Sequence, residues 1–254
     1  MRAARALREF GLLALLLLPV VAASARPTSA AADLIYQPYG SWNGKKIYLS
    51  PARHLSGPRA RGECGDRSED QLAFRAAWYA ANGSYFNDRS APRSAYRNLR
   101  ARHYRVRIGR GTYVSAVSRS NAWGATRHVV LHSNAHRARD CGNTNASRFG
   151  TLGIYRQGST RGRDLSAKLT HAFGVNANRG PRRSPGTHDF ICANPGDPCT
   201  QINLYELRAT VMPAAYMESE FHTWRTGYRW LDTSPYWAWR LGWGVDWHLG
   251  WPRR

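Results

Sequence analysis

The sequence predicts one α/β domain, in which a twisted, mostly parallel or mixed sheet is flanked by helices. The strongest observation is the stretch His128–His136, where an apolar run ends in a polar cluster, as a buried strand does at the carboxyl edge of a sheet. Strand-like and helix-like segments alternate along the chain, which favours a single α/β unit. With 254 residues, the chain is long enough to bury a sizeable core.

The expected elements follow from local residue patterns. Short runs of apolar, β-branched or alternating residues predict strands at 46–50, 100–110, 128–136, 150–155, 204–210 and 213–218. Apolar residues at helical spacing predict helices at 68–80, 113–121 and 164–173. The first of these helices begins at Ser68, a predicted N-cap residue that precedes two carboxylates. Residues 179–199 are rich in Pro, Gly and Arg and predict an irregular segment.

The two ends of the chain differ from the middle in composition. Residues 1–25 have a basic start, an apolar centre too short to span a bilayer and a small-residue end, which is typical of a secretory signal peptide. A retained membrane anchor is the alternative. Residues 26–43 are expected to be a lead-in segment. Seven of the ten tryptophans lie within residues 224–251, where Ser234 and Pro235 predict the start of a Trp-rich C-terminal helix. These tryptophans serve either core packing or carbohydrate stacking.

Cysteine usage and charge indicate the compartment and the partners. Four cysteines follow the signal segment, and an even number in an oxidising compartment predicts two disulfides. Cys192 and Cys199 bracket a turn-rich loop, and their pairing would leave Cys64 with Cys141, although the other two connectivities stay open. The formal charge of +21 predicts a polyanionic partner. Because the chain is expected to be secreted, anionic cell-wall polymers or phospholipid headgroups fit better than nucleic acid.

Four polar residues fall at predicted strand ends or at a helix start of one sheet, namely His54, Glu69, His132 and Glu218. Zinc hydrolases commonly use three histidine or carboxylate ligands and leave a position open for water. Two histidines and one glutamate would supply such a set, and a second glutamate would move the proton. Two of these residues also have a simpler interpretation. His132 could be a hydrogen-bonded histidine at a strand end, and Glu69 could be a carboxylate that complements the helix dipole.

In this order and spacing, these residues resemble those of the zinc-dependent N-acetylmuramoyl-L-alanine amidases, which are bacterial cell-wall hydrolases. The segment Lys46–His54 is similar to the strand and proline-containing loop that carry the family's first histidine, and Glu69 follows at the family's spacing. Val130–Ala135 is similar to the family's Ser-Ile-His-Ala-Asn segment, and Pro213–Phe221 matches its Pro-Ala-x-x-x-Glu-x-x-Phe strand. The likeness covers roughly residues 45–221.

The resemblance implies a domain at 44–254 that cuts the bond between the lactyl group of N-acetylmuramic acid and the L-alanine of the stem peptide. It implies Zn²⁺ held by His54, Glu69 and His132, with Glu218 as the catalytic acid–base. Two departures stand out. The loop before His54 lacks the family's glycines, and Glu220 lies where the family often has glycine, on the same strand face as Glu218 if the strand alternates regularly.

The resemblance also implies where the protein acts and on what. We expect a secreted monomer that acts at the cell wall on peptidoglycan, without nucleic acid and without membrane association after signal cleavage. Two alternatives stay open. One is a non-catalytic cell-wall or polyanion-binding protein on an amidase scaffold, and the other is a secreted zinc peptidase.

Overall fold

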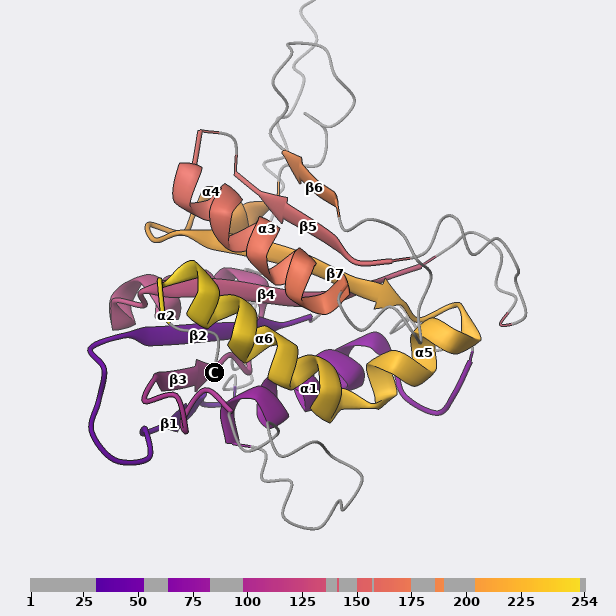
Figure 1. Ribbon diagram of the computed structural model, residues 1–254, viewed down its shortest axis with the longest axis horizontal. Coiled ribbons are helices and arrows are strands. Elements are labelled where there is room, and N and C mark those ends of the chain that lie inside the picture. Colours follow the sequence, from indigo (N-terminus) through magenta and orange to yellow (C-terminus); the bar gives the residue numbers. More distant parts are fainter. Residues whose placement is uncertain are drawn as a thin grey trace, which may run out of the picture.

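The computed structural model describes residues 31–52, 64–82, 98–135, 141, 150–156, 158–174, 186–189 and 204–251. These residues form one sheet with helices on both faces (Figure 1). The expected α/β architecture with a mixed sheet is therefore confirmed. The predicted signal peptide, most of the predicted irregular segment and the loop that contains His54 lie outside the described residues.

The sheet has seven strands in the order β1-β3-β2-β4-β7-β5-β6 within the described part of the chain. The strands are β1 (Leu34–Tyr36), β2 (Lys46–Pro51), β3 (Arg105–Ile108), β4 (Arg127–Asn134), β5 (Leu152–Tyr155), β6 (Gly186–Asp189) and β7 (Ala214–Phe221). The central strands β3, β2, β4 and β7 run parallel, whereas β1 pairs antiparallel with β3 and β5 pairs antiparallel with β7. The carboxyl ends of β2, β4 and β7 therefore meet at one edge.

The helices form a layer on each side of the sheet (Figure 1). They are α1 (Glu69–Asn82), α2 (Tyr113–Trp123), α3 (Thr160–Gly174), α4 (Tyr205–Arg208), α5 (Arg225–Asp232) and α6 (Ser234–His248). The larger core lies between the sheet and α1, α3 and α6, and it includes Val129, Leu131 and Met217. Smaller clusters lie under α2 and α4 on the other face, where Val130 is buried. No helix in the described ranges combines the length and apolarity that a membrane span needs.

Local sequence explains where α1 begins. The backbone N–H of Ser68 donates to the side chain of Gln71 (2.9 Å), and Leu72 N donates to Ser68 O (3.0 Å). The first of these bonds is one half of a capping box, in which the side chain at the third helical position accepts from the N-cap backbone, and it fits Ser68 as the N-cap. Glu69 is consequently the first helical residue, where the helix dipole favours a carboxylate.

Three elements differ from the sequence-based expectations. The residue pattern at 204–210 predicts a strand, but Tyr205–Arg208 forms the short helix α4, which packs on β7. The lead-in segment contains β1, whose residues Leu34 and Tyr36 pair with β3. A further helix, α5, precedes the terminal helix α6. In each case the contact with the rest of the domain decides the local structure, because segments of three to eight residues have little intrinsic preference.

A buried carboxylate holds the edge strand β1 against the carboxyl end of β3. The side chain of Asp33 is 1% exposed and accepts hydrogen bonds from Tyr48 Oη (2.9 Å), Arg107 Nε (2.8 Å) and Arg119 (2.6 Å). Burial alone would raise the pKa of Asp33, but these donors and the backbone N–H of Arg110 hold it below its ordinary value of 3.8.

We expect Asp33→Asn to lower the free energy of unfolding by about 1.5–3 kcal/mol at pH 6, because charge-assisted hydrogen bonds are lost. A carboxylate with a lowered folded-state pKa stabilises above its unfolded pKa, and this contribution disappears as pH falls through the folded-state value. Urea denaturation of both proteins at pH 6, 4 and 2.5 measures the difference. It should shrink below pH 3.8; a difference that stays constant to pH 2.5 contradicts the assignment.

Candidate active site

Glu69 and His132 meet at the carboxyl edge of the sheet. Glu69 begins α1, His132 lies near the end of β4, and both residues are buried. His132 Nδ1 and Glu69 Oε1 are 2.9 Å apart, and the same carboxylate oxygen accepts a hydrogen bond from the backbone N–H of Ser133 (3.0 Å). The structure thus brings together two residues that are 63 positions apart in the sequence.

Glu218 lies beside this pair. On the parallel strands β4 and β7, His132 and Glu218 are paired in register, which puts them next to each other at the same edge. Glu218 is partly exposed, unlike Glu69. Burial alone would lower the pKa of His132, but the hydrogen bond and charge of Glu69, and the charges of Glu218 and Glu206, raise it above its ordinary value of 6.5.

Tyr216 supports the histidine ring. The two rings stack with centroids 4.5 Å apart and an interplanar angle of 21°. Burial raises the pKa of Tyr216 well above its ordinary value, and the charges of Glu218, Glu206 and Glu69 add to the effect. Tyr216 is therefore neutral at physiological pH, and its ring fixes the plane of the His132 imidazole.

The ends of the two site strands are held together by a second polar pair. Ser133 Oγ and His222 Nδ1 lie 2.9 Å apart, and His222 N donates to Asn134 O (3.0 Å). Both side chains are buried. Since Ser133 also holds Glu69 through its backbone N–H, these contacts make the site edge a rigid support.

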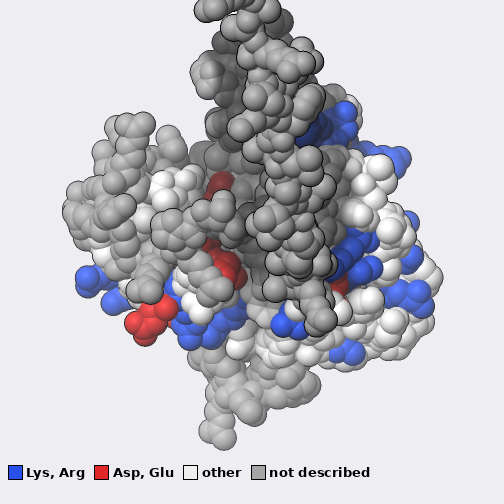
Figure 2. All heavy atoms as spheres, turned by 180° about the vertical axis from the view of Figure 1, so that it is seen from behind, with Lys and Arg blue, Asp and Glu red and all other residues white. Residues whose placement is uncertain are grey.

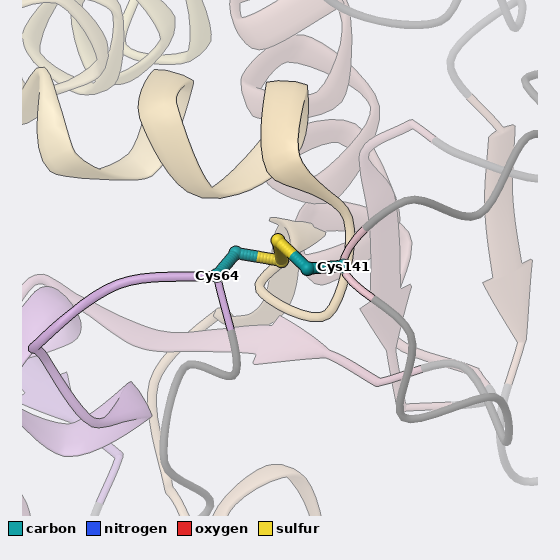
Figure 3. The surroundings of a disulfide bond; sticks show 2 residues. All are labelled: Cys64 and Cys141. Carbon is teal, nitrogen blue, oxygen red and sulfur yellow. A yellow bond between two sulfur atoms is a disulfide. The ribbon is translucent and has the colours of Figure 1, made fainter.

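A disulfide joins the segment before α1 to the segment after β4 (Figure 3). It links Cys64 with Cys141, and their Cα atoms are 5.0 Å apart. The pairing predicted for these two cysteines is therefore confirmed. Cys192 and Cys199 lie outside the described residues. Because Cys64 precedes Glu69 by five positions, the disulfide ties down the start of α1 close to the candidate site.

Comparison with solved structures gives a consistent result. The fold is similar to an N-acetylmuramoyl-L-alanine amidase from Clostridium difficile 630, with 19% identity, a TM-score of 0.57 and coverage of 82% of this chain and 98% of that one. It is also similar to the amidase AmiC2 of Nostoc punctiforme, with 14% identity, a TM-score of 0.59 and coverage of 83% and 99%. The catalytic domain of CwlV, an amidase from Bacillus (Paenibacillus) polymyxa, gives 15% identity, a TM-score of 0.55 and coverage of 81% and 98%.

This chain has the fold of the N-acetylmuramoyl-L-alanine amidases. The TM-scores and the coverage establish the shared architecture although the identities are below 20%. They confirm the fold that the sequence resemblance implied. No protein-family model matches the sequence, and no curated protein gives a significant match.

Within this amidase fold, the four expected site residues have different outcomes. Glu69, His132 and Glu218 come together at one sheet edge. His54 lies outside the described residues, although β2, which ends at Pro51 just before it, pairs with β4 and leads toward the same edge. Among the residues that the structure describes, no group of three or more His, Cys, Asp or Glu side chains is arranged as a metal cage.

Glu220, the competitor of Glu218, takes a different position. The register of β7 shifts against β4, so that His132 pairs with Glu218 but Asn134 pairs with Phe221, which is a β-bulge. The regular alternation that would place both glutamates on one face is therefore broken. Glu220 is 5% exposed, and its carboxylate accepts from Gly150 N (3.0 Å) and Phe221 N (2.9 Å).

Burial raises the pKa of Glu220 to about 7, despite these two backbone donors. A carboxyl group with a raised folded-state pKa destabilises the fold as pH rises through that value. We therefore expect Glu220→Gln to gain stability relative to the wild type as pH rises from 4.5 to 8, by about 3 kcal/mol. Urea denaturation of both proteins across this range tests the expectation, and a difference independent of pH would contradict it.

Sequence reasoning missed Glu206, a buried carboxylate on α4 near the site. Glu206 Oε1 accepts from Ser50 Oγ and lies 3.5 Å from His128 Nε2. His128 in turn lies 2.9 Å from Ser120 Oγ. The only sequence signal is that carboxylates are scarce in this basic chain, with 16 Asp and Glu in total.

Proposed function

We propose that this protein is a secreted, zinc-dependent peptidoglycan amidase, which hydrolyses the bond between the lactyl group of N-acetylmuramic acid and the L-alanine of the stem peptide. The observation that carries the proposal is the juxtaposition of Glu69, His132 and Glu218 at the carboxyl edge of a sheet with the amidase fold. Open α/β sheets place their ligand sites at this edge. The three similar structures are amidases, which supports this reaction class.

The donor atoms at the site fit Zn²⁺. Histidine nitrogen and glutamate oxygen are standard zinc ligands, and two ligands of one tetrahedral zinc lie about 3.3 Å apart at usual bond lengths. The 2.9 Å separation of His132 Nδ1 and Glu69 Oε1 is close to that value. His132 and Glu69 would hold the ion together with His54. When bound, zinc polarises an amide carbonyl and lowers the pKa of water.

Other residues of the chain orient the two ligand side chains and transfer the proton. Ser133 N–H holds the Glu69 carboxylate, and the Tyr216 ring holds the imidazole of His132, so both groups are oriented before substrate binds. Glu218 accepts the proton of the attacking water and transfers it to the leaving amine of L-alanine. Glu218 is partly exposed at the sheet edge, although its Oε2 atom is itself buried, so the contact with water and the leaving amine is assigned to Oε1.

Glu218 fits the acid–base role better than Glu220. The charge of Glu218 acts directly on His132, whereas the carboxylate of Glu220 is turned to the backbone of Gly150 and Phe221. The side chain of Glu220 also packs against Gly227 of α5. Glu220 therefore supports the bulged end of β7.

The proposal includes the location and the domain boundaries of the enzyme. Residues 1–25 serve as a signal peptide, residues 26–43 form a lead-in segment, and residues 44–254 form the catalytic domain. Strand β1 lies in the lead-in segment and pairs with the sheet of the catalytic domain. The mature monomer acts on peptidoglycan at the cell wall, without membrane or nucleic acid.

Product analysis tests the reaction. Purified muropeptides are incubated with the protein, with and without a chelator, and the products are identified by mass spectrometry. The proposal expects chelator-sensitive release of intact stem peptides with a free amino-terminal L-alanine. Cleavage within the stem instead indicates a zinc peptidase, and unchanged muropeptides with a folded, zinc-loaded protein indicate a non-catalytic wall-binding protein.

A further inference from the structure

A compact surface of aromatic and basic side chains lies beside β1 and β3, and we call it the basic aromatic surface. Tyr39 is 44% exposed and Trp42 is 41% exposed, which is unusual for large aromatic residues that no partner covers. The guanidinium carbon of Arg100 lies 4.1 Å from the ring centre of Tyr39, and that of Arg105 lies 4.1 Å from the ring centre of Trp42. Lys45 is included in this surface because it is partly exposed and its carbonyl accepts from the indole N–H of Trp42.

The backbone holds this surface in one arrangement. Tyr39 N donates to Arg100 O (3.0 Å), and Arg105 N donates to Lys45 O (3.1 Å). The indole N–H of Trp42 donates to the same carbonyl of Lys45 (3.0 Å). The two cation–aromatic pairs are therefore preformed. Binding of a ligand to them costs little conformational entropy, because the side chains are already ordered.

Acidic residues are scarce in the sequence segments that form this surface. Residues 34–46 and 98–110 contain no Asp or Glu. The carboxylate of Asp33, which lies at the other end of β3, is buried and already binds Arg107 and Arg119. Lys45 and Arg105 have no carboxylate partner among the residues that the structure describes. The side of the molecule that carries β1 to β3, at the right of Figure 2, shows groups of Lys and Arg atoms with few acidic atoms between them.

The surface lies away from the candidate active site. Lys45 immediately precedes β2, and Arg105 begins β3, so both lie at the amino ends of these parallel strands. Glu69 and His132 lie at the opposite, carboxyl edge. A ligand bound at the basic aromatic surface therefore leaves the site open to substrate.

We propose that the basic aromatic surface binds an anionic polysaccharide and anchors the protein to it. Exposed aromatic rings stack on sugar rings, and adjacent guanidinium and ammonium groups pair with the acidic groups that the polymer carries. The combination recognises a polymer that has both features. Both rings lie against guanidinium groups, and each is held by a hydrogen bond, the Trp42 ring to Lys45 O and the Tyr39 hydroxyl to Asn82 Oδ1, which suits stacking on a ligand better than insertion into a bilayer. This binding needs no turnover and is separate from the proposed amidase activity.

Binding to three soluble polymers tests the proposal. Polygalacturonate carries sugar rings and carboxylates, dextran carries sugar rings alone, and polyglutamate carries carboxylates alone. Calorimetric titration of the full chain at low salt should show at least about 10-fold tighter binding to polygalacturonate than to either of the other polymers. Vesicles of phosphatidylglycerol are the fourth ligand, and they test whether the basic aromatic surface binds lipid headgroups instead.

Matched variants locate the binding. Trp42→Ala should weaken polygalacturonate binding about 5-fold and leave polyglutamate binding unchanged, whereas Arg105→Gln should weaken both. The controls are Trp251→Ala, at a tryptophan that is 43% exposed, and Arg163→Gln, at an exposed arginine of α3. Both should stay within about 2-fold of the wild type. Thermal melting checks that every variant is folded, and Tyr39→Ala, which removes the other exposed ring, serves as the test if Trp42→Ala unfolds.

Three results would overturn the proposal. Equal binding of polyglutamate and polygalacturonate, with no effect of Trp42→Ala or of Tyr39→Ala, would show that the surface attracts polyanions by charge alone. Equal losses in the control variants would mean that no local surface exists. Tighter binding to the vesicles than to polygalacturonate would show that the basic aromatic surface binds a lipid membrane rather than a polysaccharide. Since none of these readouts depends on hydrolysis, they are independent of whether the protein is an amidase.

Discussion

Replacing Glu218 with glutamine should reduce the rate of muropeptide hydrolysis by about 10²- to 10⁴-fold, the usual contribution of a general acid–base. Glutamine has nearly the same shape as glutamate but cannot accept the proton of the attacking water. Because Glu218 is partly exposed and lies beside the Glu69–His132 pair, the substitution should leave folding and zinc binding intact. Stem-peptide release measured by mass spectrometry gives the rate, and metal analysis gives the zinc content.

The matched control for this variant is Glu220→Gln, two positions away on the same strand. Its carboxylate contacts the backbone of Gly150 and Phe221, so the substitution should change the pH dependence of stability and leave most of the activity. Loss of activity in Glu220→Gln with turnover retained in Glu218→Gln would exchange the roles of the two residues.

His132→Ala should abolish stoichiometric zinc binding and, with it, activity. Loss of an outer partner of a zinc ligand typically weakens binding about 10- to 100-fold, so the loss of a ligand itself should exceed about 100-fold. The substitution also removes one hydrogen-bond partner of the buried Glu69 carboxylate, leaving the backbone N–H of Ser133, and we therefore expect a lower melting temperature. Metal analysis after dialysis against a defined zinc concentration measures the effect without reference to activity.

An exposed histidine provides the control for metal loss. His171 lies on α3 against the rings of Trp243 and Trp247, on a helix that packs over the sheet's larger core rather than at the site edge. His171→Ala should bind zinc as the wild type does. If His132→Ala retains one zinc per chain, then the ligand assignment is wrong, whatever its activity.

The parts of the fold that are predictable from sequence are those with strong local signals. The apolar run of β4 and the Ser68 cap of α1 each specify their element within a few residues, and the structure confirms that Glu69 and His132 lie at the ends of these elements. Pairing of β4 with β7 then brings Glu218 to the same edge. Glu69 and His132 are predictable because each lies at or near the end of a well-marked element, whereas β7 continues three residues beyond Glu218.

The remaining features depend on tertiary contacts that leave no local trace. Leu204 and Leu207 belong to a pattern typical of a strand, yet they pack against β7 at a short helix, which brings Glu206 to the site. The bulge in β7 carries no glycine or proline, and only the pairing with β4 reveals that Glu218 and Glu220 diverge. Strand β1 is three residues long, and it forms because its backbone pairs antiparallel with β3.

A zinc titration of the chelated wild-type protein, with release of intact stem peptides as the readout, tests the proposed site most directly. We predict no release without metal, and release that rises with added zinc and saturates at one equivalent per chain. Full activity in the thoroughly chelated protein, or no release after one equivalent of zinc is bound to the folded chain, would contradict the claim that the edge carrying Glu69, His132 and Glu218 is a zinc-dependent hydrolytic site.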